Sequence, residues 1–491
     1  MAVTFTDGNL EYVHDSKTID PTGETAAFAA EVANLGGDRF LVGFIRQLNI
    51  SAPGWAPQDM GMRVLQVNND LTVTPEALTA FDSEPIYVGR YRSPMVGVAT
   101  DKVLLVGEQG IDAYTAPSFA DDHLTAFLID CSGALPTVSG TLEIDSTATS
   151  FMEFNTRGNS QIAVLSPTRA IVTSRGTRNI SHDTAWVQLL DISGAAPVLL
   201  AGPTAVYVQS QFRNIQLIPV SATTAILVWL DWTNVGGTMR FSPRMQWMDV
   251  TGDTIQTQAI GYGPGPVVTQ VGNPIVQVDD EPAVQADGYN YLGAVKSGPG
   301  NKIILSAQYY NGSTTTKKFL QVSYYPSDHT TFTIDSVQTQ PAAPAGHTYT
   351  GDVRAAAGIV GVEGGALATR TVYDDSTFGN LERSAVYTAA TQPALDFGTA
   401  STVSGAVDPL ANVNDNYIFD HRMKMDVNPS TGRGIMTATD YEYFDASGDE
   451  FFSCFGRSFR TQYTAPPGGG GTGWGSDGVD GQWSVGQIAW H

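Results

Sequence analysis

The sequence contains very little cysteine. Only Cys131 and Cys454 occur in 491 residues, too few for a disulfide framework and without the spacing of a zinc site. They fall in the second and seventh of the repeats described below. A whole repeat unit separates them, whereas a disulfide needs Cα atoms within ~7 Å. We therefore predict two unpaired thiols that behave as small core residues.

Basic residues are also scarce. The chain has 26 Lys and Arg against 49 Asp and Glu, a net charge of −23. Such a surface repels phosphate backbones, and no basic run offsets it, so we expect no nucleic-acid partner. No window approaches the ~18 apolar residues of a membrane span. The start, "MAVTFTDGNLEYVHDSKTID", lacks a secretory signal. We expect neither membrane insertion nor a signal peptide.

Motifs for catalysis are missing as well. The seven His residues show no metal spacing, and neither a nucleophile elbow nor a phosphate-binding loop occurs. Carboxylates cluster at Asp279-Asp280-Glu281, at Asp374-Asp375, and at Asp415 with Asp420 and His421. They could serve glycoside chemistry or hold Ca²⁺, or be solvated turns. We assign no catalytic residue and no cofactor, and leave a metal site open.

The composition is that of an ordered β protein. Charged residues make up 15% of the chain, against about 25% in typical globular proteins. Apolar residues make up 42%, and there are 51 Gly and 26 Pro. This balance is typical of a turn-rich all-β fold.

A hairpin pattern recurs along the chain. "QIAVLSPTRAIVTS" (161–174) has two apolar runs around a Ser-Pro-Thr-Arg turn, and "GVATDKVLLVG" (97–107) and "LIPVSATTAILVWL" (217–230) repeat it. Seven second runs occur, about 66 residues apart on average. They begin at Phe40, Val103, Ala170, Ala225, Ile303, Ala366 and Gly434. In five of them a basic residue comes just before the run: Arg39, Lys102, Arg169, Lys302 and Arg433.

Two more runs follow most hairpins, which gives four strands per repeat. The pattern resembles the seven-bladed β-propellers. The stretch 166–193 is similar to a WD40 repeat, with Leu190-Asp191 where that family has Trp-Asp, although its Gly-His opening is absent. Ile129-Asp130 and Met248-Asp249 stand in equivalent places. A pair of sandwiches or jelly rolls is the alternative.

The seventh repeat lacks a fourth strand. The residues after it, "TAPPGGGGTGWG", are unsuited to a strand. We predict that residues 1–20 supply that strand and close the propeller of residues 21–465, with the competing donor "GQWSVGQIAWH" at the other end. Residues 466–491 would then form a Gly-rich arm that buries Trp474, Trp483 and Trp490 against a neighbouring chain or a recessed surface of the propeller.

Strand order sorts the connections by face. The segments between second and third strands are long and carry aromatic and acidic residues, so we expect a ligand- or partner-binding face there. The expected binding residues are Trp55, Tyr114, Trp232, Tyr309, Tyr310, Asp374, Asp375, Tyr441 and Tyr443.

The composition resembles that of bacteriophage adhesins and fibre proteins. This resemblance implies a non-enzymatic structural or receptor-engaging component of a virus particle, such as a tail or capsid fibre, located in the virion. Its partners would be other virion proteins and a host surface glycan or protein, within a larger assembly. The alternatives are a carbohydrate-binding lectin or glycoside-active enzyme on the same scaffold, and an intracellular scaffold that reads peptide motifs.

Overall fold

The computed structural model describes most strands of the chain and the turns between them. The described residues are 2–5, 11–14, 25–48, 58–80, 94–109, 123–145, 161–179, 182–209, 212–235, 238–256, 276–277, 292–297, 301–310, 315–329, 331–343, 345–349, 359–362, 365–374, 381–390, 396–397, 401–402, 424–444 and 450–462. All the regular structure in these ranges is β-strand. In this part of the chain no helix is long and apolar enough to cross a bilayer.

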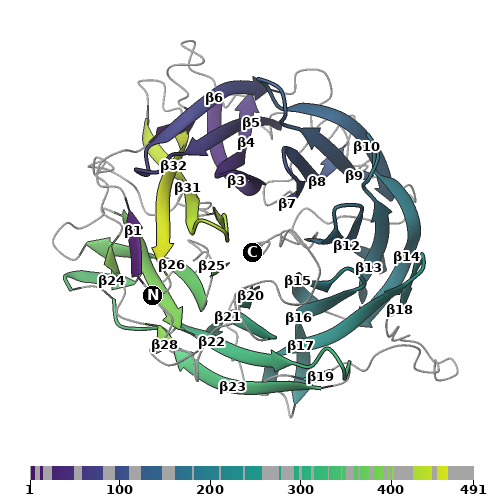
Figure 1. Cartoon of the computed structure of the whole chain (residues 1–491). Helices are drawn as coiled ribbons and strands as arrows, with labels where there is room; N and C mark the ends of the chain where they lie inside the picture. Colours follow the sequence, from purple (N-terminus) through teal and green to yellow (C-terminus); the bar gives the residue numbers. More distant parts are fainter. Residues whose placement is uncertain are drawn as a thin grey trace, which may run out of the picture.

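The strands form antiparallel sheets that follow one another along the chain and surround a central axis (Figure 1). The first three sheets have four strands each. They are β3 (Thr25–Gly36), β4 (Arg39–Leu48), β5 (Gln58–Val67) and β6 (Val73–Ala80); then β7 (Met95–Ala99), β8 (Lys102–Gln109), β9 (His123–Asp130) and β10 (Thr137–Asp145); then β11 (Gln161–Ser166), β12 (Arg169–Asn179), β13 (His182–Asp191) and β14 (Val198–Gln209).

The fourth and fifth sheets continue the pattern, with one short extra strand in the fourth. The fourth has β15 (Phe212–Ser221), β16 (Thr224–Val235), β17 (Thr238–Thr251), β18 (Thr254–Gln256) and β19 (Val276–Gln277); the fifth has β20 (Leu292–Ser297), β21 (Lys302–Tyr310), β22 (Thr315–Tyr324) and β23 (Phe332–Thr339).

The last two sheets are less regular. The sixth has β24 (His347–Tyr349), β25 (Ile359–Val362), β26 (Gly365–Asp374), β27 (Leu381–Ala390), β28 (Asp396–Phe397) and β29 (Ser401–Thr402). The seventh joins β30 (Lys424–Val427), β31 (Arg433–Phe444) and β32 (Glu450–Gln462) to β1 (Ala2–Phe5) and β2 (Glu11–His14). Both amino-terminal strands pair antiparallel with β32, Ala2 with Gln462 and Glu11 with Gly456.

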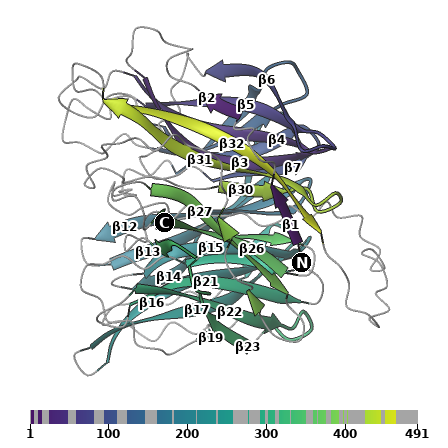
Figure 2. The ribbon, with the colours of Figure 1, turned by 90° about the vertical axis from the view of Figure 1, so that its left-hand side faces the viewer.

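The innermost strands of neighbouring sheets lie against one another around the axis. Each of these strands contacts the next one in the order β3, β7, β11, β15, β20, β25 and β30, and β30 in turn contacts β3. Figure 2 shows the sheets stacked from the side. The predicted all-β propeller of four-stranded antiparallel blades is confirmed.

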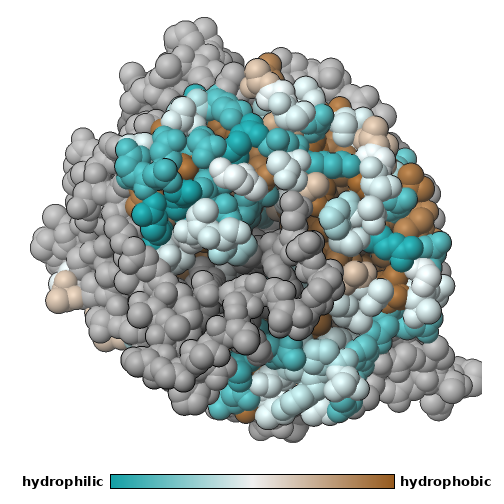
Figure 3. Space-filling view, in the orientation of Figure 1, coloured by the Kyte–Doolittle hydropathy of each residue, from teal (hydrophilic) through white to brown (hydrophobic). Residues whose placement is uncertain are grey.

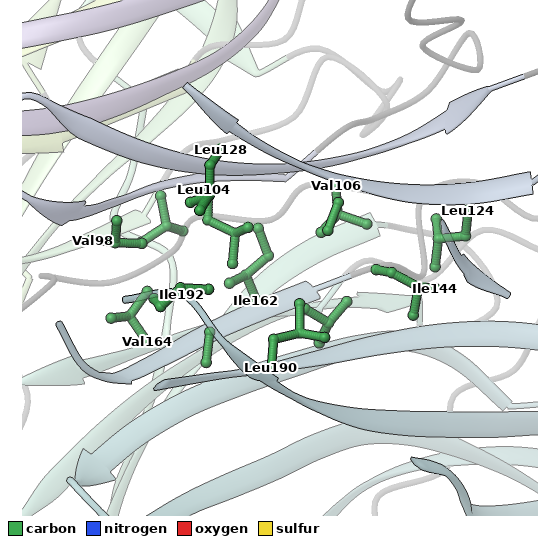
Figure 4. Close-up of a cluster of buried hydrophobic side chains, with 14 residues drawn as sticks. Val98, Leu104, Val106, Leu124, Leu128, Ile144, Ile162, Val164, Leu190 and Ile192 are labelled. Carbon is green, nitrogen blue, oxygen red and sulfur yellow. The ribbon is translucent and has the colours of Figure 1, made fainter. Parts of the chain in front are cut away.

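Apolar clusters between adjacent sheets form the core. The cluster between the second and third sheets shows the arrangement: Leu104 and Leu128 of one sheet meet Ile162 and Leu190 of the next (Figure 4). All four side chains are fully buried. At roughly 25 cal/mol per Å² of buried apolar surface, such clusters supply the main favourable contribution to folding. Successive side chains along a strand point to opposite faces of the sheet, so one sheet contributes side chains to the clusters on both of its sides.

The aspartates that stand in place of the Trp-Asp signature have a local role. Asp130 and Asp191 end the third strands β9 and β13. Their Oδ1 atoms accept hydrogen bonds from the backbone N–H groups of Ser132 (2.8 Å) and Ser193 (2.9 Å). Hydrogen bonds from the Ser132 and Ser193 side chains, and second from these backbone N–H groups, lower the pKa of both carboxyls. The turn to the fourth strand is thereby fixed by an Asx motif.

Candidate functional site: the loop face and the closing interface

The ring has two distinct faces. The turns between first and second strands and those between third and fourth strands lie on one face, which we call the turn face. Arg433 after β30 bonds to Asn69 in the turn after β5 and to Asp38 in the turn after β3. Every second strand therefore begins at the turn face and ends at the opposite face, which we call the loop face.

Six of the predicted binding residues lie toward the ends of second strands. Trp232 lies in β16, Tyr309 and Tyr310 end β21, Asp374 ends β26, and Tyr441 and Tyr443 lie in β31. These strands belong to four successive sheets, so the backbone positions follow one arc of the loop face. The other six predicted residues fall outside the described residues: Trp55, Tyr114, Asp375, Trp474, Trp483 and Trp490.

The expectation that these residues stand in loops was wrong for Trp232, Tyr309, Tyr310, Asp374, Tyr441 and Tyr443, which all lie in strands. The second and third strands pair far beyond the core: Val235 with Thr238, Tyr310 with Thr315, and Phe444 with Glu450. The reason is β propensity. Aromatic and β-branched residues such as those of "WTNV" fit a pleated ribbon, so the paired strands extend through these segments. Long hairpins thus carry the residues expected in loops.

A polar network occupies the turn face between the first and last sheets. Asp38 Oδ1 accepts hydrogen bonds from Asn428 Nδ2 (2.8 Å) and from the Thr431 hydroxyl, and Asp38 Oδ2 pairs with Arg433. Arg433 also donates to Asn69 Oδ1. These groups, with Asn34 and Asp426 on the innermost strands, form what we call the closing interface. Figure 3 shows hydrophilic surface over this part of the turn face.

Asp426 is the most unusual group of the closing interface. Its Oδ2 accepts a hydrogen bond from the Asn34 N–H and its Oδ1 from the Val427 N–H, both at 2.8 Å. Burial raises the pKa of its carboxyl to about 8, and the nearby Glu31 adds to the rise, while the two amide bonds act against it. Asn34 completes the contact by donating from Nδ2 to the Val427 carbonyl at 3.1 Å.

The basic residues that precede the second strands connect neighbouring sheets. Arg39 pairs with Asp101 in the next sheet and with Glu76 in its own sheet. Lys102 donates hydrogen bonds to the carbonyl oxygens of Ile192 and Gly194 in the sheet that follows its own, both at 2.8 Å. Two more follow the same rule: Arg169 pairs with Asp253 at 2.9 Å and Arg433 with Asp38. The exception is Lys302, which pairs with Asp335 of its own sheet at 2.7 Å.

A histidine connects the fourth and fifth sheets. His329 Nδ1 lies 2.9 Å from Asp249 Oδ2, and Nε2 lies 2.9 Å from the Pro326 carbonyl. The ring stacks on Trp247, with centroids 4.4 Å apart. Sequence reading missed His329 because its partner lies 80 residues away.

Most of the predicted acidic clusters lie outside the described residues. No group of three or more His, Cys, Asp or Glu within the described ranges could hold a metal ion. Of the acidic clusters, Asp374 is described, and Asp279, Asp280, Glu281, Asp375, Asp415, Asp420 and His421 lie outside. Cys131 is a buried free thiol, whereas the Cys454 side chain is not described.

No protein-family model and no curated protein matches the sequence. Solved structures resemble the chain in outline. A protein of unknown function from Dyadobacter fermentans has a TM-score of 0.40 and 10% identity, covering 94% of this chain and 99% of its own. The GH93 α-L-arabinofuranosidase of Fusarium graminearum in complex with arabinobiose has 0.40 and 8%, covering 92% and 97%. Drosophila Plexin A in complex with Semaphorin 1b has 0.41 and 7%, covering 92% and 88%. These likenesses concern the fold alone.

Proposed function

We propose that the chain is a non-enzymatic docking module whose loop face binds a partner. In this proposal it serves as a structural or receptor-engaging component of a virus particle, such as a bacteriophage tail or capsid fibre. The observation that carries the proposal is the position of Trp232, Tyr309, Tyr310, Asp374, Tyr441 and Tyr443 at the ends of second strands in four successive sheets. Aromatic and acidic residues along one arc suit several weak contacts that act together.

The contacts made by the carboxylates of Asp38 and Asp426 favour a binding role over a catalytic one. The carboxylates of Asp38 and Asp426 accept hydrogen bonds that hold the first and last sheets together. A catalytic carboxylate needs access to substrate, and Asp426 is 8% exposed with both oxygens occupied. The lectin alternative keeps the same face and replaces the protein partner by a glycan, whose apolar ring faces stack on aromatic side chains.

Three further features belong to the proposal. Each sheet acts as one of seven blades, β1 and β2 complete the last blade, and residues 466–491 form an arm that docks on a neighbour in the particle through Trp474, Trp483 and Trp490. The strand pairs between β1 and β32 and between β2 and β32 support the second of these.

A triple substitution tests the loop face. Trp232, Tyr309 and Tyr310 are replaced together by Ala, and binding to a glycan array and to purified virus particles is measured. We expect loss of more than the ~1 to 3 kcal/mol of one aromatic anchor, which is a loss of over about tenfold in Kd. The fold should persist, as judged by circular dichroism.

A matched control variant tests whether the position of the three side chains matters, or only the loss of exposed apolar side chains. Leu135, Leu199 and Tyr325 are large and exposed at 43%, 38% and 41%, and they lie outside the proposed arc. Their triple Ala variant should bind like the parent chain. Loss on the glycan array alone identifies a lectin, and loss on particles alone identifies a docking protein. Parent-like binding of the Trp232 triple variant in both assays would overturn the proposal.

A further inference from the structure

The interface between the first and last sheets differs from the other interfaces at one position. The position lies on the first strand of each repeat, opposite the second residue of the following strand's apolar run; Ala33 opposite Leu41 is an example. The residue at this position is apolar in six repeats and Asp in the last. The six are Ala33, Val96, Ala163, Ile218, Val295 and Val360, and the seventh is Asp426. Every repeat but the last therefore contributes a neutral group here, and the last contributes an acid.

This acid is buried without a described cation beside it. Glu31 on β3 is the charged side chain that acts on it, and it has the same sign. On its own strand, Lys424 stands two residues earlier with its side chain outside the described part. From β31, the residues paired with β30 are uncharged: Gly434, Ile435, Met436 and Thr437. Arg433, a described cation of the closing interface, is paired with Asp38.

We propose that the closing interface is a pH-dependent gate, closed while Asp426 is neutral and loosened when Asp426 ionises. A buried carboxylate beside a second carboxylate is costly, because burial removes the solvation that stabilises its charge and the second carboxylate has the same sign. Opening between β3 and β30 admits water and removes this cost. The gate acts on two backbone amides, those of Asn34 and Val427, which the Asp426 carboxyl holds in the closed state.

The direction of the effect follows from the pKa of Asp426. In the closed ring this pKa is raised from its ordinary value of 3.8 to about 8, and an opened, hydrated interface would restore the ordinary value. The closed state therefore binds a proton more tightly. The stabilisation of the closed state by this proton is fully present below about pH 4. It declines as the pH rises from about 4 to about 8 and is lost above about pH 8. Alkaline conditions favour the open ring.

Hydrogen exchange measured by mass spectrometry tests the gate. Peptides that contain Asn34 and Val427 are followed between pH 5 and 9 in the parent chain and in Asp426→Asn, with peptides of β16 and β17 as internal reference. After normalisation for intrinsic exchange, the opening constant of the parent should rise by up to about tenfold per pH unit. In Asp426→Asn it should stay flat with pH, from a weaker starting protection, because Asn cannot ionise.

Two more variants make the outcome decisive. Glu31→Gln removes the like charge and should reduce the pH dependence while the fold persists. Asp335→Asn is the control: the pKa of Asp335 is lowered by its bonds to Lys302 and Ser323, so this variant should leave the alkaline opening at β3 and β30 unchanged. The same pH profile in the parent, Asp426→Asn and Glu31→Gln would overturn the gate, as would opening that increases toward acid.

Discussion

Replacement of Arg433 by Ala should be among the most destabilising single changes on the turn face. Arg433 and Asp38 form an ion pair whose side chains are only 14% and 6% exposed. The substitution leaves the Asp38 carboxylate buried, with the neutral donors Asn428 and Thr431 as its remaining described partners. Breaking one side of a buried pair costs ~3 to 5 kcal/mol. Because the guanidinium keeps some contact with water, we expect about 3 kcal/mol.

Arg169→Ala provides the matched control. Arg169 precedes its second strand as Arg433 does, and it pairs with Asp253 in the next sheet, but the two side chains are 32% and 60% exposed. Exposed pairs are worth ~0 to 1 kcal/mol. Urea unfolding followed by circular dichroism should therefore show a large loss for Arg433→Ala and almost none for Arg169→Ala.

A second substitution isolates the charge. Asp38 has a φ of 62°, a left-handed conformation that Asn also tolerates, so Asp38→Asn keeps the turn and removes the charge. The double variant Arg433→Ala with Asp38→Asn should be more stable than Arg433→Ala alone. Equal losses for Arg433→Ala and Arg169→Ala, or a double variant that loses the sum of its two single changes, would refute the reasoning.

Two other predictions concern packing and thiol chemistry. Gly97→Ala should destabilise the chain by more than ~2 kcal/mol, because a Cβ there would lie 1.9 Å from the Asn34 carbonyl oxygen. Gly133→Ala is the control: the nearest atom to its Cβ would lie at 3.7 Å, so this variant should be near neutral in the same urea experiment. Burial raises the pKa of the Cys131 thiol to about 12. Cys131 should therefore resist iodoacetamide at pH 8 until the chain unfolds, and labelling of the native protein at the rate of free cysteine would contradict this.

The local features of the fold could be predicted from the sequence, and the long-range contacts could not. Apolar runs around short polar turns predicted the hairpins, and the third strands of the second and third repeats end at Asp130 and Asp191 as the WD40-like pattern indicated. The basic residue before five of the seven second runs was visible in the sequence, but its partner was not. Arg433 and Asp38 are 395 positions apart, and only closure of the ring brings them together.

The predicted loop residues show a similar limit. Trp232 and Tyr309 were expected in loops and lie in strands, because the β propensity of aromatic and β-branched residues extends the hairpins beyond the core. Asp426 could have been found as the one acid among the equivalent apolar positions of the repeats. The meaning of that difference, a polar interface between the first and last sheets, depends on contacts between residues 392 positions apart.

A hydrogen-exchange footprint of the chain mixed with purified virus particles, the proposed partner, tests the central claim most directly. If the loop face is the docking surface, binding should slow exchange in peptides from the ends of β16, β21 and β31, around Trp232, Tyr310 and Tyr443. Peptides from the turns around Asp38 and Thr431 should exchange as they do in the free chain. Protection confined to the turn face, with the strand ends unaffected, would contradict the account.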